Sequence, residues 1–91
     1  MEIGEKQALD IVHSMTKALT FKDRGYSVGK IDSSWAKVPK QAFKLVDESS
    51  SAFVYKVTNK ANKQTLVLSI NKNGRVASVN DEAVTTHGHQ H

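Results

Sequence analysis

The sequence contains no cysteine, which excludes structural disulfides, zinc sites built on thiolates and thiol-based catalysis. No stretch has the roughly 18 consecutive apolar residues that a membrane-spanning helix needs. We therefore expect a soluble protein, cytoplasmic by default and exported if a signal peptide that preceded Met1 was removed. Aromatic residues make up only 7% of the chain, so the core is expected to be mainly aliphatic.

The chain also lacks the usual signatures of enzymes. It has neither a glycine-rich phosphate loop nor a Gly-x-Ser-x-Gly motif. The serines at positions 49–51 are typical of a turn. Asp47 and Glu48 are adjacent, so on a strand their side chains would point to opposite faces and could not form an acid pair. We expect no enzymatic activity and no cofactor.

Acidic residues are scarce in the second half of the chain. The net charge is +4 at pH 7; residues 1–32 are neutral overall, residues 33–80 carry a net charge of +6, and the segment from residue 81 onward carries −2. No acidic residue occurs between Ser49 and Asn80. The positive charge is therefore concentrated where the strand patterns are strongest, which predicts a partner with an acidic surface.

The first element that the pattern predicts is an amphipathic helix from Glu5 to about Lys22. Its apolar residues recur at helical spacing and fall within an arc of roughly 120°. They are Ala8, Ile11, Val12, Met15, Ala18 and Leu19. Gly25 is well placed as the residue that ends the helix. Such a helix has one apolar face to bury.

Two later segments, 52–58 and 65–71, alternate between apolar and polar residues as strands do. Asn73-Gly74 predicts a two-residue type I′ hairpin turn between the second of these segments and a further strand. In that register one face of the sheet is buried. It consists of Leu66, Leu68, Ile70, Ala77 and Val79, with Phe53, Tyr55 and Val57 on the same side. Val76 and Lys56 are expected to point outward.

The middle of the chain is less clearly patterned. Residues 26–31 read as an irregular connector or a short edge strand, and residues 39–46 fit either a helical turn or a strand. We favour a turn followed by a strand near 42–46, with 47–51 as the next turn. Together these patterns predict an α+β fold, in which the N-terminal helix packs on an antiparallel β-meander of three to five strands. We expect one domain over residues 1–80 and a flexible tail over residues 81–91.

Residues 52–80 resemble the PepSY family of small domains. In that family a strand with Tyr-x-Val precedes a strand that ends in an acidic-x-x-Gly-x-Val hairpin; here the matching residues are Tyr55 and Val57, then Asn71, Gly74 and Val76. Asn71 replaces the usual aspartate, and residues 23–51 are longer than such a domain needs. The resemblance implies an extracytoplasmic, non-catalytic module that binds or inhibits a partner protein.

Five basic residues are the main candidates for a binding surface. They are Lys56, Lys60, Lys63, Lys72 and Arg75. We expect them to serve a non-enzymatic module that binds or inhibits another protein, preferably one with an acidic surface. The alternative is a nucleic-acid-binding protein, in which the same residues at the turns of the sheet would contact phosphates. The absence of outward-facing aromatic residues for base stacking weighs against that alternative.

Trp35, the only tryptophan, either covers the core beneath the connector or, if exposed, anchors a partner. His87, His89 and His91 alternate in a way that can bring imidazoles to Zn²⁺, Ni²⁺ or Cu²⁺. The sequence offers no residues to orient these imidazoles and no carboxylate at ligand spacing. We therefore interpret the histidines as part of a solvated tail and expect no metal site. An unpaired sheet edge makes a homodimer another expectation.

Overall fold

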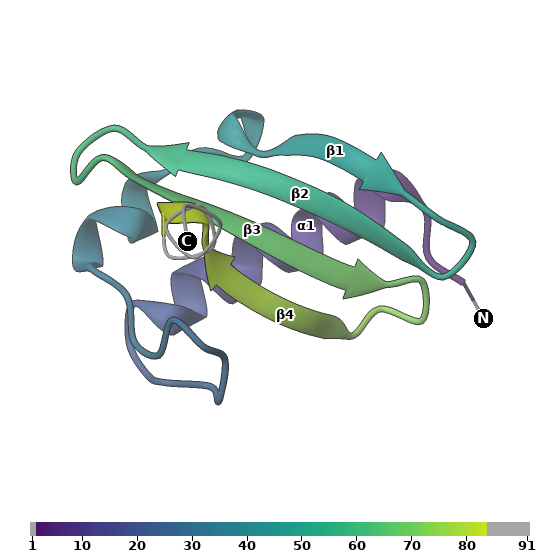
Figure 1. Cartoon of the computed structure of the whole chain (residues 1–91), viewed down its shortest axis with the longest axis horizontal. Helices are drawn as coiled ribbons and strands as arrows, with labels where there is room; N and C mark the ends of the chain where they lie inside the picture. Colours follow the sequence, from purple (N-terminus) through teal and green to yellow (C-terminus); the bar gives the residue numbers. More distant parts are fainter. Residues whose placement is uncertain (1, 84–91) are drawn as a thin grey trace, which may run out of the picture.

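The computed structural model describes residues 2–83 and contains one α-helix, two short 3₁₀ helices and four strands (Figure 1). In chain order these are α1 (Glu5–Leu19), η1 (Ser33–Lys37), η2 (Lys40–Ala42), β1 (Lys44–Glu48), β2 (Ala52–Asn59), β3 (Gln64–Asn71) and β4 (Val76–Asp81). No helix in this part of the chain is both long and apolar enough to span a membrane.

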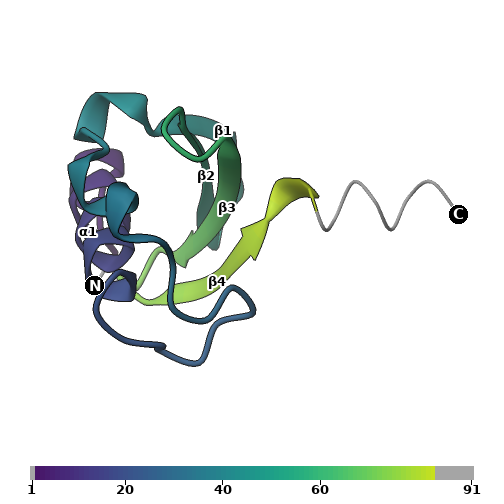
Figure 2. The same cartoon turned by 90° about the vertical axis from the view of Figure 1, so that its left-hand side faces the viewer.

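The strands form one antiparallel sheet in the order β1-β2-β3-β4, and α1 lies across one of its faces (Figure 2). Each strand thus pairs with its neighbour in sequence, as in a meander. The expected α+β fold, one N-terminal helix packed on an antiparallel sheet, is confirmed. Within residues 2–83 the other face of the sheet has no helix over it.

The core lies between α1 and the sheet. The helix contributes Ala8, Val12, Thr16 and Leu19, all of them buried. Strands β2 and β3 contribute every second residue, which is the period of a strand with one covered face. Phe53, Tyr55 and Val57 from β2 and Leu66, Leu68 and Ile70 from β3 are at most 3% exposed. These residues were all predicted to share the buried face.

The helix ends earlier than the sequence suggests. Leu19 is its last residue, and Thr20 caps it by donating its hydroxyl to the carbonyl of Lys17 at 2.7 Å. The prediction that Gly25 ends the helix is wrong. Gly25 does have a positive φ of 90°, but it occupies a turn after Asp23, whose carboxylate accepts its N–H at 2.8 Å. The helix therefore ends well before the glycine.

The hairpin between β3 and β4 differs from the prediction near its turn. The loop has three residues, 72–74, with Gly74 at φ 94° and its N–H bonded to the carbonyl of Asn71, so it is not a two-residue type I′ turn. Ile70 pairs with Val76, and a bulge at Ala77 restores the predicted register from Ser69–Ser78 onward. As a result Val76 is buried and Ala77 is exposed, the reverse of the prediction.

The segment from Pro39 to Ser51 contains both alternatives that the sequence left open. A 3₁₀ turn over Lys40–Ala42 is followed by β1, which begins two residues later than expected. Asp47 and Glu48 belong to this strand and not to the following turn, which is confined to residues 49–51. A bulge places Val46 outside the regular pairing of β1 with β2, where it is 53% exposed.

The two edge strands of the sheet, β1 and β4, are protected in different ways. The connector after α1 closes over β4: the Tyr26 hydroxyl donates to the carbonyl of Val76, and the Ser27 hydroxyl donates to that of Val79, both at 2.8 Å. Edge strand β1 has only five residues, carries a bulge and is mostly exposed. Short, bulged and charged edge strands resist uncontrolled pairing with other chains.

The first residue of the predicted tail belongs to the sheet. Asp81 completes β4 and pairs with Leu66. It also accepts hydrogen bonds from the Gln64 side chain at 2.7 Å and from the backbone N–H of Ala83 at 2.8 Å. Residues 84–91 of the predicted tail, with His87, His89 and His91, lie outside the described residues.

Candidate functional site

The five predicted basic residues do not form one surface. Lys60 and Lys63 belong to the turn between β2 and β3, whereas Lys72 and Arg75 lie between β3 and β4, at the opposite end of the sheet (Figure 1). Since β3 has eight residues, the two turns are about 24 Å apart at roughly 3.4 Å per residue. A single short ligand cannot contact both groups at once.

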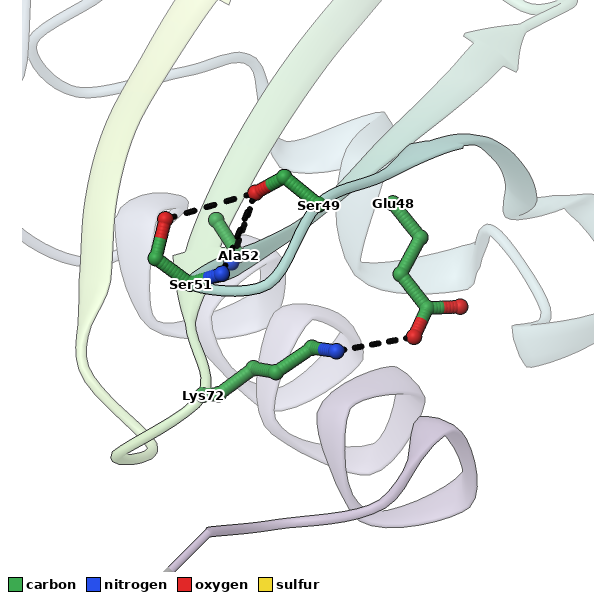
Figure 3. Close-up of polar contacts among 5 residues, drawn as sticks. All are labelled: Glu48, Ser49, Ser51, Ala52 and Lys72. Atoms are coloured by element: carbon green, nitrogen blue, oxygen red, sulfur yellow. Dashed lines mark hydrogen bonds and ion pairs between the residues drawn. The ribbon is translucent and has the colours of Figure 1, made fainter.

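Lys72 is tied to its neighbours. Its Nζ lies 2.9 Å from a carboxylate oxygen of Glu48 and 4.9 Å from the centre of the Phe53 ring, and its side chain is 17% exposed. Figure 3 shows the lysine running beneath the 49–51 turn toward Glu48, while the Ser49 hydroxyl accepts the N–H groups of Ser51 and Ala52. This cluster stabilises the turn, as expected for its serines, and leaves Lys72 little freedom to bind a partner.

Trp35 is fully buried, so it cannot serve as an exposed partner anchor. It lies on η1, in the core beneath the connector. Its indole N–H donates to Gln64 Oε1 at 2.7 Å, and Gln64 in turn donates to Asp81 at 2.7 Å. A buried indole N–H needs a hydrogen-bond partner. This chain of hydrogen bonds supplies one, and it fixes η1 to the start of β3 and the end of β4.

A concave site lies next to η1. A hollow of about 680 Å³ separates the η1–η2 segment from the end of β2 and its turn. One wall carries Ser34, Lys37, Val38, Pro39, Gln41 and Ala42, and the other carries Thr58, Asn59, Lys60 and Ala61. We call its apolar lining, which consists of Val38, Pro39, Ala42 and Ala61, the floor; lysines stand on both walls. A volume of this size lies within the range of roughly 300–1,000 Å³ that ligand sites occupy.

A second hollow of about 480 Å³ continues the first toward the open face of the sheet. The two share Gln41, Ala42, Thr58 and Lys60, and the second adds Lys44, Val46 and Lys56. We call the two hollows together the lysine groove. Lys44 and Lys56 pair directly across β1 and β2, on the face away from α1. Like charges opposite each other on neighbouring strands are unfavourable, so an anion bound between them would relieve their repulsion.

The charges of the lysine groove are largely unbalanced. None of the residues that line it is acidic. Lys56 forms an ion pair with Glu82, but within residues 2–83 no carboxylate lies within 4.0 Å of the amino group of Lys37, Lys44 or Lys60. The pairing of Lys56 with Glu82 shows that a carboxylate fits at this rim.

The two walls of the groove are joined by a buried amide. Asn59 is 3% exposed, donates to the Ser34 hydroxyl at 2.8 Å and accepts the N–H of Ala61 at 3.0 Å. Ser34 in turn bonds to Asp32, the cap of η1. The Ser34 hydroxyl, helped by the Ser34 N–H, lowers the pKa of the Asp32 carboxyl. Asn59 therefore holds the walls at a fixed separation before any ligand arrives.

Two of the four groove lysines, Lys56 and Lys60, were predicted as binding residues, and Lys37 and Lys44 were missed. The signal for the missed pair was the net positive charge of residues 33–80, but charge along the chain does not say which lysines meet in space. Among the described residues no cluster of three or more histidine, aspartate or glutamate side chains is arranged to hold a metal ion.

By its architecture the protein belongs to the α+β class, with a single helix on an open four-stranded antiparallel sheet. More narrowly, residues 1–84 match a family of unknown function (DUF6488), and the chain belongs to that family. No curated protein and no solved structure matches the chain.

Proposed function

We propose that this protein is a small, non-enzymatic module that binds another protein, and inhibits it where binding covers a functional surface, through an acidic segment of that partner. The observation that carries the proposal is the set of three lysines, Lys37, Lys44 and Lys60, that line one groove and have no carboxylate partner within residues 2–83. Charge complementarity of this kind steers association and selects acidic partners.

The resemblance of residues 52–80 to PepSY domains supports the same proposal, since those domains are non-catalytic modules that bind or inhibit proteins. It adds an extracytoplasmic location to the proposal. Nucleic-acid binding has less support for two reasons. The turn residues predicted to contact phosphates lie at opposite ends of the sheet, Lys60 and Lys63 at one end and Lys72 and Arg75 at the other. No aromatic side chain lines the lysine groove to stack on a base.

A pull-down from a lysate of the source organism tests the proposal. The wild-type chain is compared with the groove variant Lys37→Glu/Lys44→Glu/Lys60→Glu. The control is Lys6→Glu/Lys17→Glu/Lys22→Glu, which makes the same charge change on exposed lysines of α1 and the residues after it. We expect an acidic protein that the wild type and the control retain, that the groove variant loses, and that added salt releases.

Two results would contradict the proposal. One is that the groove variant retains the same proteins as the wild type. The other is that labelled DNA, duplex or single-stranded, binds the wild type at about 50 mM salt and loses affinity in the groove variant, which would identify a nucleic-acid site instead.

A further inference from the structure

We infer that the lysine groove recognises an extended peptide in which aliphatic side chains are flanked on both sides by carboxylates. This inference rests on the proposed function and names the kind of segment that the partner presents. It combines two features of the groove: the apolar floor of the larger hollow, and lysines that stand on both walls of that hollow and at the second hollow.

The floor selects the aliphatic part of the ligand. Val38, Pro39, Ala42 and Ala61 line the larger hollow, while the side chain of Val38 is itself 8% exposed and continuous with the core. A pocket with an apolar floor and a few polar groups gains affinity by removing apolar surface from water. An acidic segment without aliphatic residues would leave this floor solvated.

The lysines of the groove select the acidic part of the ligand. Lys37 and Lys60 stand on the two walls of the larger hollow, and Lys44 stands with Lys56 at the second hollow. Because Glu82 already occupies Lys56, the first carboxylates of the ligand are expected at Lys37, Lys60 and Lys44. The carboxylates of the peptide therefore lie at these lysines, and its aliphatic side chains lie against the apolar residues of the larger hollow.

The walls are set before binding, which favours a short ligand. Asn59 bonds Ser34 on one wall and the N–H of Ala61 on the other. A preformed groove does not spend binding free energy on its own ordering, so a peptide of about six residues can show measurable affinity.

Three fluorescein-labelled, end-capped hexapeptides test the inference by fluorescence anisotropy at low salt. The probe is Glu-Glu-Leu-Leu-Glu-Glu; the matched controls are Glu-Glu-Ser-Ser-Glu-Glu and Gln-Gln-Leu-Leu-Gln-Gln. We expect the probe to bind at least about fivefold more tightly than either control, because each control lacks one of the two contributions. Its addition should shift the backbone amide resonances of Lys37, Ala42 and Lys60.

Two protein variants locate the site. Lys37→Gln/Lys60→Gln should weaken binding of the probe about tenfold, whereas Lys22→Gln/Lys30→Gln, with the same change in charge at exposed positions of the connector, should leave it unchanged. Ala61→Trp should block the groove, because Ala61 is exposed and lines the larger hollow. If Ala61→Trp loses amide dispersion, Gln41→Trp, also exposed and lining the groove, replaces it.

The outcomes separate this inference from the proposed function. Equal affinity for the leucine and serine peptides, both lost in Lys37→Gln/Lys60→Gln, would overturn the inference and leave an acidic partner standing. If the wild type and Lys37→Gln/Lys60→Gln bind every peptide with equal affinity, the inference is overturned and the groove is not the binding site. Displacement of the probe by single-stranded DNA at equimolar concentration would overturn both.

Discussion

Replacement of Asn59 by alanine tests whether the walls of the lysine groove are held together as described. The side chain is 3% exposed and makes two hydrogen bonds, to the Ser34 hydroxyl and from the N–H of Ala61. Each bond contributes about 1 kcal/mol net, and the Ala61 N–H is left without its acceptor, so Asn59→Ala should lower the free energy of unfolding by about 2–3 kcal/mol. A domain of this size has on the order of 5–10 kcal/mol to lose, so the variant should still fold.

Urea denaturation followed by circular dichroism measures this loss as a lower midpoint at an unchanged slope. Thr58→Ala serves as the control. Thr58 is exposed and only shares a surface hydrogen bond with Thr65, so its replacement should cost less than about 1 kcal/mol. A double-mutant cycle of Asn59→Ala with Ser34→Ala should give a coupling energy of about 1 kcal/mol.

A loss of less than about 0.5 kcal/mol in the free energy of unfolding of Asn59→Ala, or a coupling with Ser34 that is zero within error, would contradict this role of the amide. Either result would mean that the two walls hold their positions without the amide. Fixed walls would then have to come from the packing of η1 around Trp35.

Three further predictions concern the pH dependence and the strain of the fold. Burial raises the pKa of Tyr55 above its ordinary value of 10.0, and the Tyr55 hydroxyl donates to the Glu5 carbonyl. The neutral phenol therefore contributes its full stability below pH 10, and this stability is lost at higher pH. The urea midpoint of Tyr55→Phe should fall less steeply above pH 10, and equal slopes would contradict this. Hydrogen bonding to Lys40 lowers the pKa of Asp10 from 3.8, so stability is lost as the pH falls below that value. Asp10→Asn should lose less stability than the wild type in the same pH titration, and an equal loss would contradict the pairing of Asp10 with Lys40. Lys63 has a φ of 60°, which strains a residue with a side chain. Lys63→Gly should therefore raise the free energy of unfolding by about 0.5 kcal/mol, whereas Lys60→Gly in the same turn should lower it. A lower free energy of unfolding for Lys63→Gly than for Lys60→Gly would contradict the strain at Lys63.

Much of the fold could be predicted because the strands alternate so regularly. The buried faces of β2 and β3 follow directly from the period of two in residues 52–58 and 65–71. Far from the turn the register of β3 with β4 was also correct, since it pairs Leu68 with Val79. Near the turn it was not, because a three-residue loop and a compensating bulge at Ala77 cancel each other along the strand. Such a pair of irregularities leaves no mark on the hydrophobic pattern.

The candidate site could be predicted only in part, because it depends on contacts between distant segments. Lys56 and Lys60 stood out as basic residues on strands and turns. Lys37 joins them because Trp35 and Asn59 fasten η1 to the start of β3 and the end of β2. Lys44 joins them because β1 pairs with β2. Nothing in the spacing of these residues indicates that they meet. Trp35 illustrates the same limit, since its burial follows from a connector whose path no periodicity defines.

The bonds that fasten the connector to β4 bear on the order in which the protein folds. The hydroxyls of Tyr26 and Ser27 reach strand carbonyls 50 and 52 residues further along the chain. Loops of that length cost chain entropy to close, whereas the hairpins between neighbouring strands close over only a few residues. The connector can dock only after β4 has paired with β3. We therefore expect the connector to join late during folding and to be among the first parts of the native protein to open.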